Sequence, residues 1–385
     1  MIQKNRNTVL VFGALLQLFL GIIYVWSVFV APVSEYYNWA ISDAKLTSSF
    51  MLSFFAVGIL LGGKIQLKIG TKKNVLFGGL LLAVGVFLSG LVPTSMPWLI
   101  YITYGIFGGF GVGMSYSTII GAAQKNFPDK RGLATGISVC TFGFATVIFT
   151  PLVQWLVKTV GIQNTFFCLA TSFAVVTLVC FSFITTPDVQ SSASSFSGKQ
   201  YTTGEMVKTS KFYLIAGSMM FSIAAFFILN PSFFTLAEER GLSASMAATM
   251  LMISGIANAA GRLIFPLISD KLGAKKTLVI MHIITTICAL SLTVASGGLL
   301  IVVVSLIACC YGGTSGVYPV FTGDHFGLQH VGANYGAVMV SFALSSLIFP
   351  LLLSPISSMM AKFIILGAVA AVAALMVFMV KTAKK

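Results

Sequence analysis

The segment Gly63-Lys-Ile-Gln-Leu-Lys68-Ile-Gly70-Thr-Lys72-Lys73 recurs later in the chain as Pro266-Leu-Ile-Ser-Asp270-Lys271-Leu-Gly273-Ala-Lys275-Lys276. Each copy is a short basic connection between two long apolar runs. A second pair, Arg131-Gly-Leu-Ala-Thr-Gly136 and Val331-Gly-Ala-Asn-Tyr-Gly336, recurs at nearly the same spacing. Two pairs in nearly the same register indicate that one half of the chain is a duplicate of the other.

The apolar runs around these segments predict twelve membrane-spanning helices. Of the 385 residues, 57% are hydrophobic and 8% are charged, against roughly 25% charged residues in a soluble domain, which excludes a soluble enzyme. About 20 apolar residues cross a bilayer as a helix. The runs cover residues 8–31, 44–66, 74–93, 97–123, 132–158, 164–185, 211–236, 243–269, 275–297, 299–322, 331–355 and 359–381. The expected fold is therefore an all-α membrane protein with six spans in each half.

A polar stretch separates the two halves. Residues 186–210 include five serines between Ser191 and Ser197 and have the composition of a flexible linker. We therefore expect an N-terminal six-helix bundle over residues 1–185, a cytoplasmic linker over 186–210 and a C-terminal six-helix bundle over 211–385.

The net charge of +14 reflects membrane orientation. With the N-terminus in the cytoplasm, 18 of the 23 Lys and Arg residues lie on the cytoplasmic side, four lie outside (Lys45, Lys158, Arg240 and Lys362) and one lies within a span. This asymmetry follows the positive-inside rule and places both termini in the cytoplasm. We expect a multi-pass protein of the cytoplasmic (inner) cell membrane, whose basic residues face a lipid bilayer and not a nucleic acid.

Arg262, in the middle of the eighth span, is the most informative residue. An arginine inside a span costs several kcal/mol unless it is paired, so it indicates function. The nine acidic residues all fall in loops or at span ends, so an anion from outside the protein is the natural partner of Arg262. The guanidinium group matches a carboxylate in bidentate geometry. The alternative is an arginine that reaches the headgroups or pairs with Asp270.

Other polar side chains in the spans are candidate binding residues. Asn258 lies one turn before Arg262 on the same helical face, where it could orient the guanidinium or bind the substrate. In span 10, Tyr311 and Tyr318 fall on one stripe, and Tyr116 lies at the equivalent depth of span 4. Tyr24 belongs to a similar stripe in span 1. Packing between helices is the alternative role for each of these residues.

The acid of the second repeat copy is a candidate conformational latch. Asp270, followed by Lys271, lies beside a helix end and several cations, where it would hold the cytoplasmic helix ends in one conformation. A simple cluster of orientation charges is the alternative. Both copies resemble the loop signature G-x-x-x-D-(R/K)-x-G-x-(R/K)-(R/K) of the major facilitator superfamily, although the first copy has Leu67 in place of the acid.

The chain also resembles one branch of that superfamily, the oxalate/formate antiporter family, which includes bacterial monocarboxylate transporters. The matching segments are Leu20-Gly-Ile-Ile-Tyr24-Val-Trp26-Ser-Val-Phe29-Val-Ala-Pro32, Asn126-Phe-Pro-Asp-Lys-Arg131-Gly-Leu-Ala-Thr-Gly136, Gly204-Glu-Met-Val-Lys-Thr-Ser-Lys-Phe-Tyr213, residues 258–276 and Asn334-Tyr335-Gly336. The resemblance implies the major facilitator fold and a small carboxylate bound midway between two six-helix bundles. It also implies that Arg262 holds the carboxylate and that Tyr24, Tyr116 and Tyr311 are aromatic cavity residues.

One departure from the family pattern bears on the substrate. The oxalate carriers have a lysine in span 11, eight residues after the Asn of Asn-Tyr-Gly, and this chain has Phe342 there. One fixed positive charge in an apolar cavity balances a monoanion better than a dianion, because a second carboxylate would be desolvated without a partner. The departure favours a monocarboxylate such as lactate, pyruvate or formate.

The expected function is a secondary active transporter of small monocarboxylate anions that works by alternating access, with proton symport or anion exchange as the coupling. The main alternative is an oxalate/formate antiporter. A drug/proton antiporter is disfavoured because the spans contain no acid, and a carboxylate sensor because no signalling domain is visible. We expect no enzyme activity, metal or cofactor, since the sequence has no corresponding motif. The expected partners are the carboxylate and the bilayer, with a monomeric state.

Overall fold

The structure, a computed structural model, describes residues 6–186, 199–229, 233–353 and 355–381. Within these ranges the regular elements are all helices. Ten helical segments are long and apolar enough to cross a membrane. One of them, α6 (Arg131–Cys180), bends at Gly161 (φ 80°, ψ 170°) and contains two of the predicted spans. With α6 counted twice and the 23-residue α14 (Val331–Leu353) added, the described part of the chain holds the twelve predicted spans.

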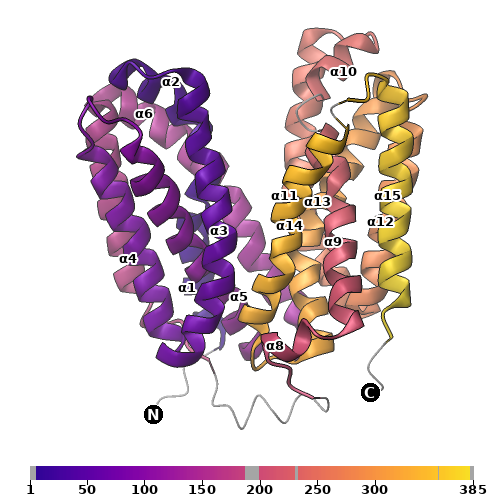
Figure 1. Cartoon of the computed structure of the whole chain (residues 1–385), viewed down its shortest axis with the longest axis horizontal. Coiled ribbons are helices and arrows are strands. Elements are labelled where there is room, and N and C mark those ends of the chain that lie inside the picture. Colours follow the sequence, from indigo (N-terminus) through magenta and orange to yellow (C-terminus); the bar gives the residue numbers. More distant parts are fainter. Residues whose placement is uncertain (1–5, 187–198, 230–232, 354, 382–385) are drawn as a thin grey trace. The chain divides into compact units, whose positions relative to one another are not determined.

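The chain folds into two compact units. The first comprises residues 1–129, 137–196 and 328–336. Its elements, besides most of α6 and the start of α14, are α1 (Arg6–Leu20), η1 (Gly21–Tyr24), α2 (Trp26–Tyr37), α3 (Ile41–Ile69), α4 (Thr71–Gly90), η2 (Tyr101–Gly108) and α5 (Gly109–Asn126). Both α3 and α4 pack on α5 (Figure 1). The residues of α5 are almost all buried.

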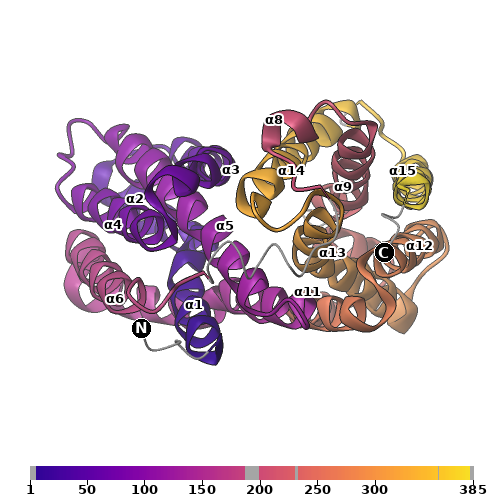
Figure 2. The same cartoon turned by 90° about the horizontal axis from the view of Figure 1, so that it is seen from below.

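The second unit comprises residues 130–136, 197–327 and 337–385. Its elements, besides the first turn of α6 and most of α14, are α8 (Thr203–Met206), α9 (Ser210–Leu229), α10 (Phe233–Glu239), α11 (Ala244–Leu272), α12 (Ala274–Ser291), α13 (Gly297–Phe326) and α15 (Met359–Met379). Helices α9, α12 and α15 pack on one another, and α11 runs along α13 (Figure 2).

The sequence-based domain boundaries at residues 1–185, 186–210 and 211–385 stay a prediction. Much of the predicted linker, residues 187–198, lies outside the described residues. After it, Thr202 and Glu205 form a capping box that starts α8: the Thr202 hydroxyl accepts a bond from the Glu205 backbone, and the Glu205 carboxylate accepts one from the Thr202 backbone. This local bonding explains why a short helix forms within a polar stretch.

The two repeated basic segments share a backbone feature, a glycine with positive φ directly after a helix. Gly70 follows α3 with φ 83°, and Gly273 follows α11 with φ 85°. At positive φ a side chain is strained, so glycine is favoured at both positions although no neighbouring atom would obstruct one. The next helix begins directly after each glycine.

Two spans differ from the continuous α-helices that the sequence predicts. Span 1 is interrupted by the 3₁₀ turn η1, where Gly21 packs so closely on Phe142 that a Cβ would overlap the Phe142 carbonyl oxygen. Span 4 begins as the π-helix η2. Hydrophobic periodicity does not distinguish a π-helix from an α-helix, which explains why this feature could not be predicted.

Candidate functional site

Arg262 lies within α11, in the C-terminal half of the helix, and is only 7% exposed. Its Nε donates a hydrogen bond to the side-chain oxygen of Asn258 at 3.3 Å. The predicted one-turn relation between these residues is therefore a direct contact. Because the bond is made by Nε, it orients the plane of the guanidinium group relative to α11.

Close contact with α13 fixes the backbone around Arg262. A Cβ on Gly312 of α13 would overlap the carbonyl oxygen of Asn258, and a Cβ on Gly316 would lie 3.1 Å from the carbonyl oxygen of Arg262. In the other direction, a Cβ on Gly261 would overlap a carbonyl oxygen of α13. These glycines let the two helix backbones touch, so the candidate binding residues sit on a rigid pair of helices.

Tyr311 lies in an aromatic cluster next to this contact. Its ring stacks on Phe226 with centroids 3.9 Å apart, and the Phe227 and Phe342 centroids lie at 5.7 and 6.5 Å. Phe227 and Phe342 are 5.2 Å apart. We call these four residues the C-terminal aromatic cluster. Because Tyr311 directly precedes Gly312, which packs on Asn258, the cluster adjoins the helix pair that carries Arg262.

Tyr24 and Tyr116 belong to a separate aromatic cluster in the first unit. Both pack against Phe142, with ring centroids 5.4 and 4.7 Å away, and Tyr116 also meets Phe55 at 5.3 Å. Gln17 donates to the backbone oxygen of Tyr116 at 3.3 Å. The structure thus brings together two tyrosines that the sequence placed on different spans.

Tyr318 has different surroundings from Tyr311. Its side chain is fully buried, and its hydroxyl donates to Ser218 of α9 at 3.0 Å and contacts Nε2 of His282 in α12 at 3.1 Å. The hydroxyl is therefore bonded within the second unit. Sequence spacing placed Tyr318 and Tyr311 on one stripe of the same helix, but the two side chains contact different residues.

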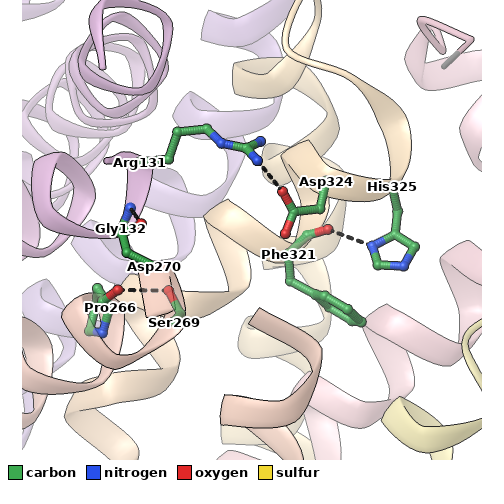
Figure 3. Close-up of polar contacts among 8 residues, drawn as sticks. All are labelled: Arg131, Gly132, Pro266, Ser269, Asp270, Phe321, Asp324 and His325. Carbon is green, nitrogen blue, oxygen red and sulfur yellow. Dashed lines mark hydrogen bonds and ion pairs between the residues drawn. The ribbon is translucent and has the colours of Figure 1, made fainter. Parts of the chain in front are cut away.

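The predicted latch residue Asp270 is bonded to the first turn of α6. Its two carboxylate oxygens accept hydrogen bonds from the backbone N–H groups of Gly132 and Leu133, at 2.6 and 2.8 Å (Figure 3). A carboxylate at a helix N-terminus is stabilised by free N–H groups and by the helix dipole. Lys271, the other predicted latch residue, is exposed.

Sequence reasoning missed a second contact at this helix start. Arg131 forms an ion pair with Asp324, near the end of α13, with an N–O distance of 2.5 Å. Figure 3 shows Arg131 reaching toward Asp324 while Gly132 lies against Asp270. The repeat of segment 131–136 marked Arg131 as a residue of interest in the sequence. No rule of sequence spacing, however, connects that segment to residue 324.

Two further acidic residues form described ion pairs, one in the connection between α5 and α6 and one in α8. Asp129 pairs with Arg6 at 2.9 Å, and Glu205 pairs with Lys199 at 2.9 Å. Among the described residues, no group of three or more His, Cys, Asp or Glu side chains could hold a metal ion.

A chain of apolar spans built from two related halves, with one arginine held inside a span, defines a multi-pass membrane transporter. The protein belongs to the Major Facilitator Superfamily, whose family model matches residues 10–350. The resemblance noted in the sequence is confirmed, since the relatives include an oxalate:formate antiporter and monocarboxylate transporters.

Two relatives and one solved structure illustrate this membership. The oxalate:formate antiporter of Oxalobacter formigenes is 27% identical over 89% of this chain and 83% of its own length. Monocarboxylate transporter 12 of Xenopus laevis is 27% identical over 77% of this chain and 69% of its own. The proton:xylose symporter XylE has a similar fold, with a TM-score of 0.73 at 15% identity, covering 98% of this chain and 96% of that one. The predicted major facilitator fold is confirmed.

Proposed function

We propose that this transporter moves small monocarboxylate anions such as lactate, pyruvate or formate by alternating access, and that Arg262 binds the carboxylate. The observation that carries the proposal is an arginine inside an apolar span, 7% exposed and oriented by Asn258. A charge at this depth is costly, and a bound anion offsets that cost. The guanidinium fork suits a carboxylate better than a point charge would.

The C-terminal aromatic cluster supports a substrate with one charge. Phe342 stands where a lysine would be needed to hold a second carboxylate, and its ring packs on Phe227 and Tyr311. An anion with one carboxylate matches one cation beside aromatic rings. We propose Asn258, Tyr24, Tyr116 and Tyr311 as further substrate contacts, with Tyr318 as a residue that supports them through its bonds to Ser218 and His282.

The relatives support the same substrate class. An oxalate:formate antiporter and a monocarboxylate transporter are both similar to this chain over most of its length. Coupling is either proton symport or anion exchange. We place the protein in the cytoplasmic (inner) cell membrane as a monomer with both termini in the cytoplasm, because 18 of its 23 basic residues then lie inside.

We further propose that Asp270, with Lys271 beside it, is a conformational latch. The carboxylate caps the first turn of α6 through two backbone N–H groups. A bond of this kind holds one arrangement of the cytoplasmic helix ends and must break when that arrangement changes.

The test is thermal stabilisation of the purified protein by formate, acetate, lactate, pyruvate, oxalate and malonate. A ligand at 100 times its Kd stabilises the folded state by about 2.7 kcal/mol, which raises the apparent Tm. We expect a monocarboxylate to stabilise the wild type and not Arg262→Ala, with a weaker effect in Arg262→Lys, which keeps the charge and loses the fork. Arg240→Ala is the control, because Arg240 donates to backbone oxygens of Leu292 and Ala295, just after α12.

The outcomes separate the alternatives. Stabilisation by oxalate alone would favour an oxalate/formate antiporter over our proposal. Equal stabilisation of the wild type and Arg262→Ala by a monocarboxylate would show that Arg262 does not bind the carboxylate. Transport in proteoliposomes, with and without a proton gradient, then distinguishes symport from exchange.

A further inference from the structure

The last turn of α13 carries two ionisable side chains that point in different directions. Asp324 points toward Arg131, with which it forms an ion pair, and His325 points to the other side of the helix end (Figure 3). Both side chains of the ion pair are partly exposed, 24% for Arg131 and 28% for Asp324, whereas His325 is 6% exposed. The ion pair is therefore open to water, and the neighbouring histidine is buried.

The hydrogen bond of His325 to Phe321 shows which ring nitrogen carries a proton. Nδ1 lies 3.0 Å from the backbone oxygen of Phe321, one turn earlier on α13. A carbonyl oxygen only accepts, so Nδ1 carries the proton. Nε2 is buried and has no hydrogen-bond partner among the described residues. The neutral ring fits this site, because a proton on Nε2 would be a buried donor without an acceptor.

The ring also fixes the turn that carries Asp324. The bond from Nδ1 to Phe321 ties residue 325 to the preceding turn, and the two rings pack edge to face at 4.5 Å. Asp324 is the residue immediately before His325, so the same turn positions the carboxylate that Arg131 contacts.

The charges around His325 are mostly positive. Lys211 at the start of α9 and Lys275 at the start of α12 act electrostatically on the ring, opposed by Asp324 on its own helix. Asp270 of α11 and Arg131 of α6 act on Asp324. Lys199, before α8, pairs with Glu205 of α8, and Tyr201 packs on Phe326. A proton on His325 would add a buried positive charge beside two lysines.

We propose that His325 is a proton sensor at the cytoplasmic end of the second unit: the neutral ring holds the last turn of α13 and the Arg131–Asp324 ion pair, and the protonated ring releases both. The protonated ring must leave its site to reach water or to compete with Arg131 for the Asp324 carboxylate. Either movement loosens the turn. Histidine suits this role because it changes charge near physiological pH. Acidification would therefore weaken the attachment of the first turn of α6.

The test measures accessibility of that turn as a function of pH. Ala134 lies in it and is fully buried. In a variant without native cysteines, Ala134→Cys is labelled with a membrane-impermeant maleimide in inside-out vesicles, with the same pH on both sides. Labelling is normalised to Lys208→Cys, which is exposed and corrects for the pH dependence of thiol reactivity. The assay uses no substrate, so its result is independent of the carboxylate proposal.

We expect relative labelling of Ala134→Cys to stay constant above about pH 7 and to rise as the pH falls below about 6.5, because the released ring has the ordinary histidine pKa; the rise is at most about tenfold per pH unit for one proton. His325→Asn, which keeps a donor near the Nδ1 position and does not titrate, should remain protected throughout. His330→Asn, the matched control at the other cytoplasmic histidine, should follow the wild type. Labelling that does not change with pH, or an unchanged pH dependence in His325→Asn, would overturn the proposal.

Discussion

The side-chain oxygen of Asn258 accepts a hydrogen bond from Nε of Arg262, one helical turn later on α11, at 3.3 Å. The pair shares a helix whose backbone is pressed against α13 at Gly312 and Gly316. The donor and acceptor are thus held in place by packing as well as by their own bond. A substitution at residue 258 can therefore place a negative charge next to Arg262 with little change in side-chain shape.

Replacement of Asn258 by Asp should abolish carboxylate binding. The new carboxylate would have nearly the same shape as the amide but would pair with Arg262 and compete with the substrate. Asn258→Ala removes only the orienting bond, and we expect it to weaken binding by about 10- to 100-fold, since a hydrogen bond to a charged group contributes about 1.5–3 kcal/mol. Calorimetric titration with the stabilising monocarboxylate measures both. Equal affinity in Asn258→Asp and Asn258→Ala would contradict this view of the site.

Replacement of Phe342 by Lys should shift the preference toward dicarboxylates. A second cation within the C-terminal aromatic cluster would give a second carboxylate a partner that it lacks in the wild type. We expect the ratio of oxalate to formate affinity to rise by about tenfold or more, equivalent to 1.4 kcal/mol. Phe342→Leu, which removes the ring without adding charge, is the control. The same ratio in both variants would show that charge at this position does not set specificity.

Replacement of Asp270 by Asn should loosen the first turn of α6. The amide keeps one oxygen acceptor for the Gly132 and Leu133 N–H groups but loses the charge that favours a helix N-terminus, a loss of about 1 kcal/mol. Labelling of Ala134→Cys at neutral pH should therefore increase. Lys276→Gln, a charge change at an exposed position of the same repeat copy, is the control. Unchanged protection in Asp270→Asn would argue against the latch.

Replacement of Gly312 by Ala should destabilise the protein. The added methyl group would overlap the carbonyl oxygen of Asn258, so α11 and α13 would have to move apart. Overpacking of this kind costs roughly 1–3 kcal/mol of unfolding free energy. Gly255→Ala on α11 is the matched control, because no atom lies within 4 Å of a Cβ there. The apparent Tm measures the effect, and equal values for the two variants would be inconsistent with the close contact.

The fold was largely predictable because membrane-spanning helices leave a strong signal. Runs of about 20 apolar residues and the repeated basic segment indicated the number and pairing of the spans. The breaks within spans were not predictable. The turn at Gly21 depends on a contact with Phe142, which is distant in the sequence, and the π-helix at Tyr101–Gly108 has the same apolar composition as an α-helix.

The candidate site was predictable only where it depends on a single helix. Asn258 and Arg262 are four residues apart on α11, so helical geometry already relates them. Tyr311 and Tyr318 show the limit of that reasoning, because their neighbours on other helices differ: Tyr311 meets Phe226, and Tyr318 meets Ser218. The Arg131–Asp324 pair joins residues far apart in the sequence and required the folded structure.

The π-helix η2 also affects how this chain is compared with its relatives. A π-helix closes its hydrogen bonds over i to i+5 instead of i to i+4, so each turn accommodates about one additional residue. A relative whose fourth span is wholly α-helical would therefore match Tyr101–Gly108 only with a gap inside the span. An alignment that forbids gaps there would shift Tyr101 and Tyr104 out of register while leaving Tyr116 correctly matched.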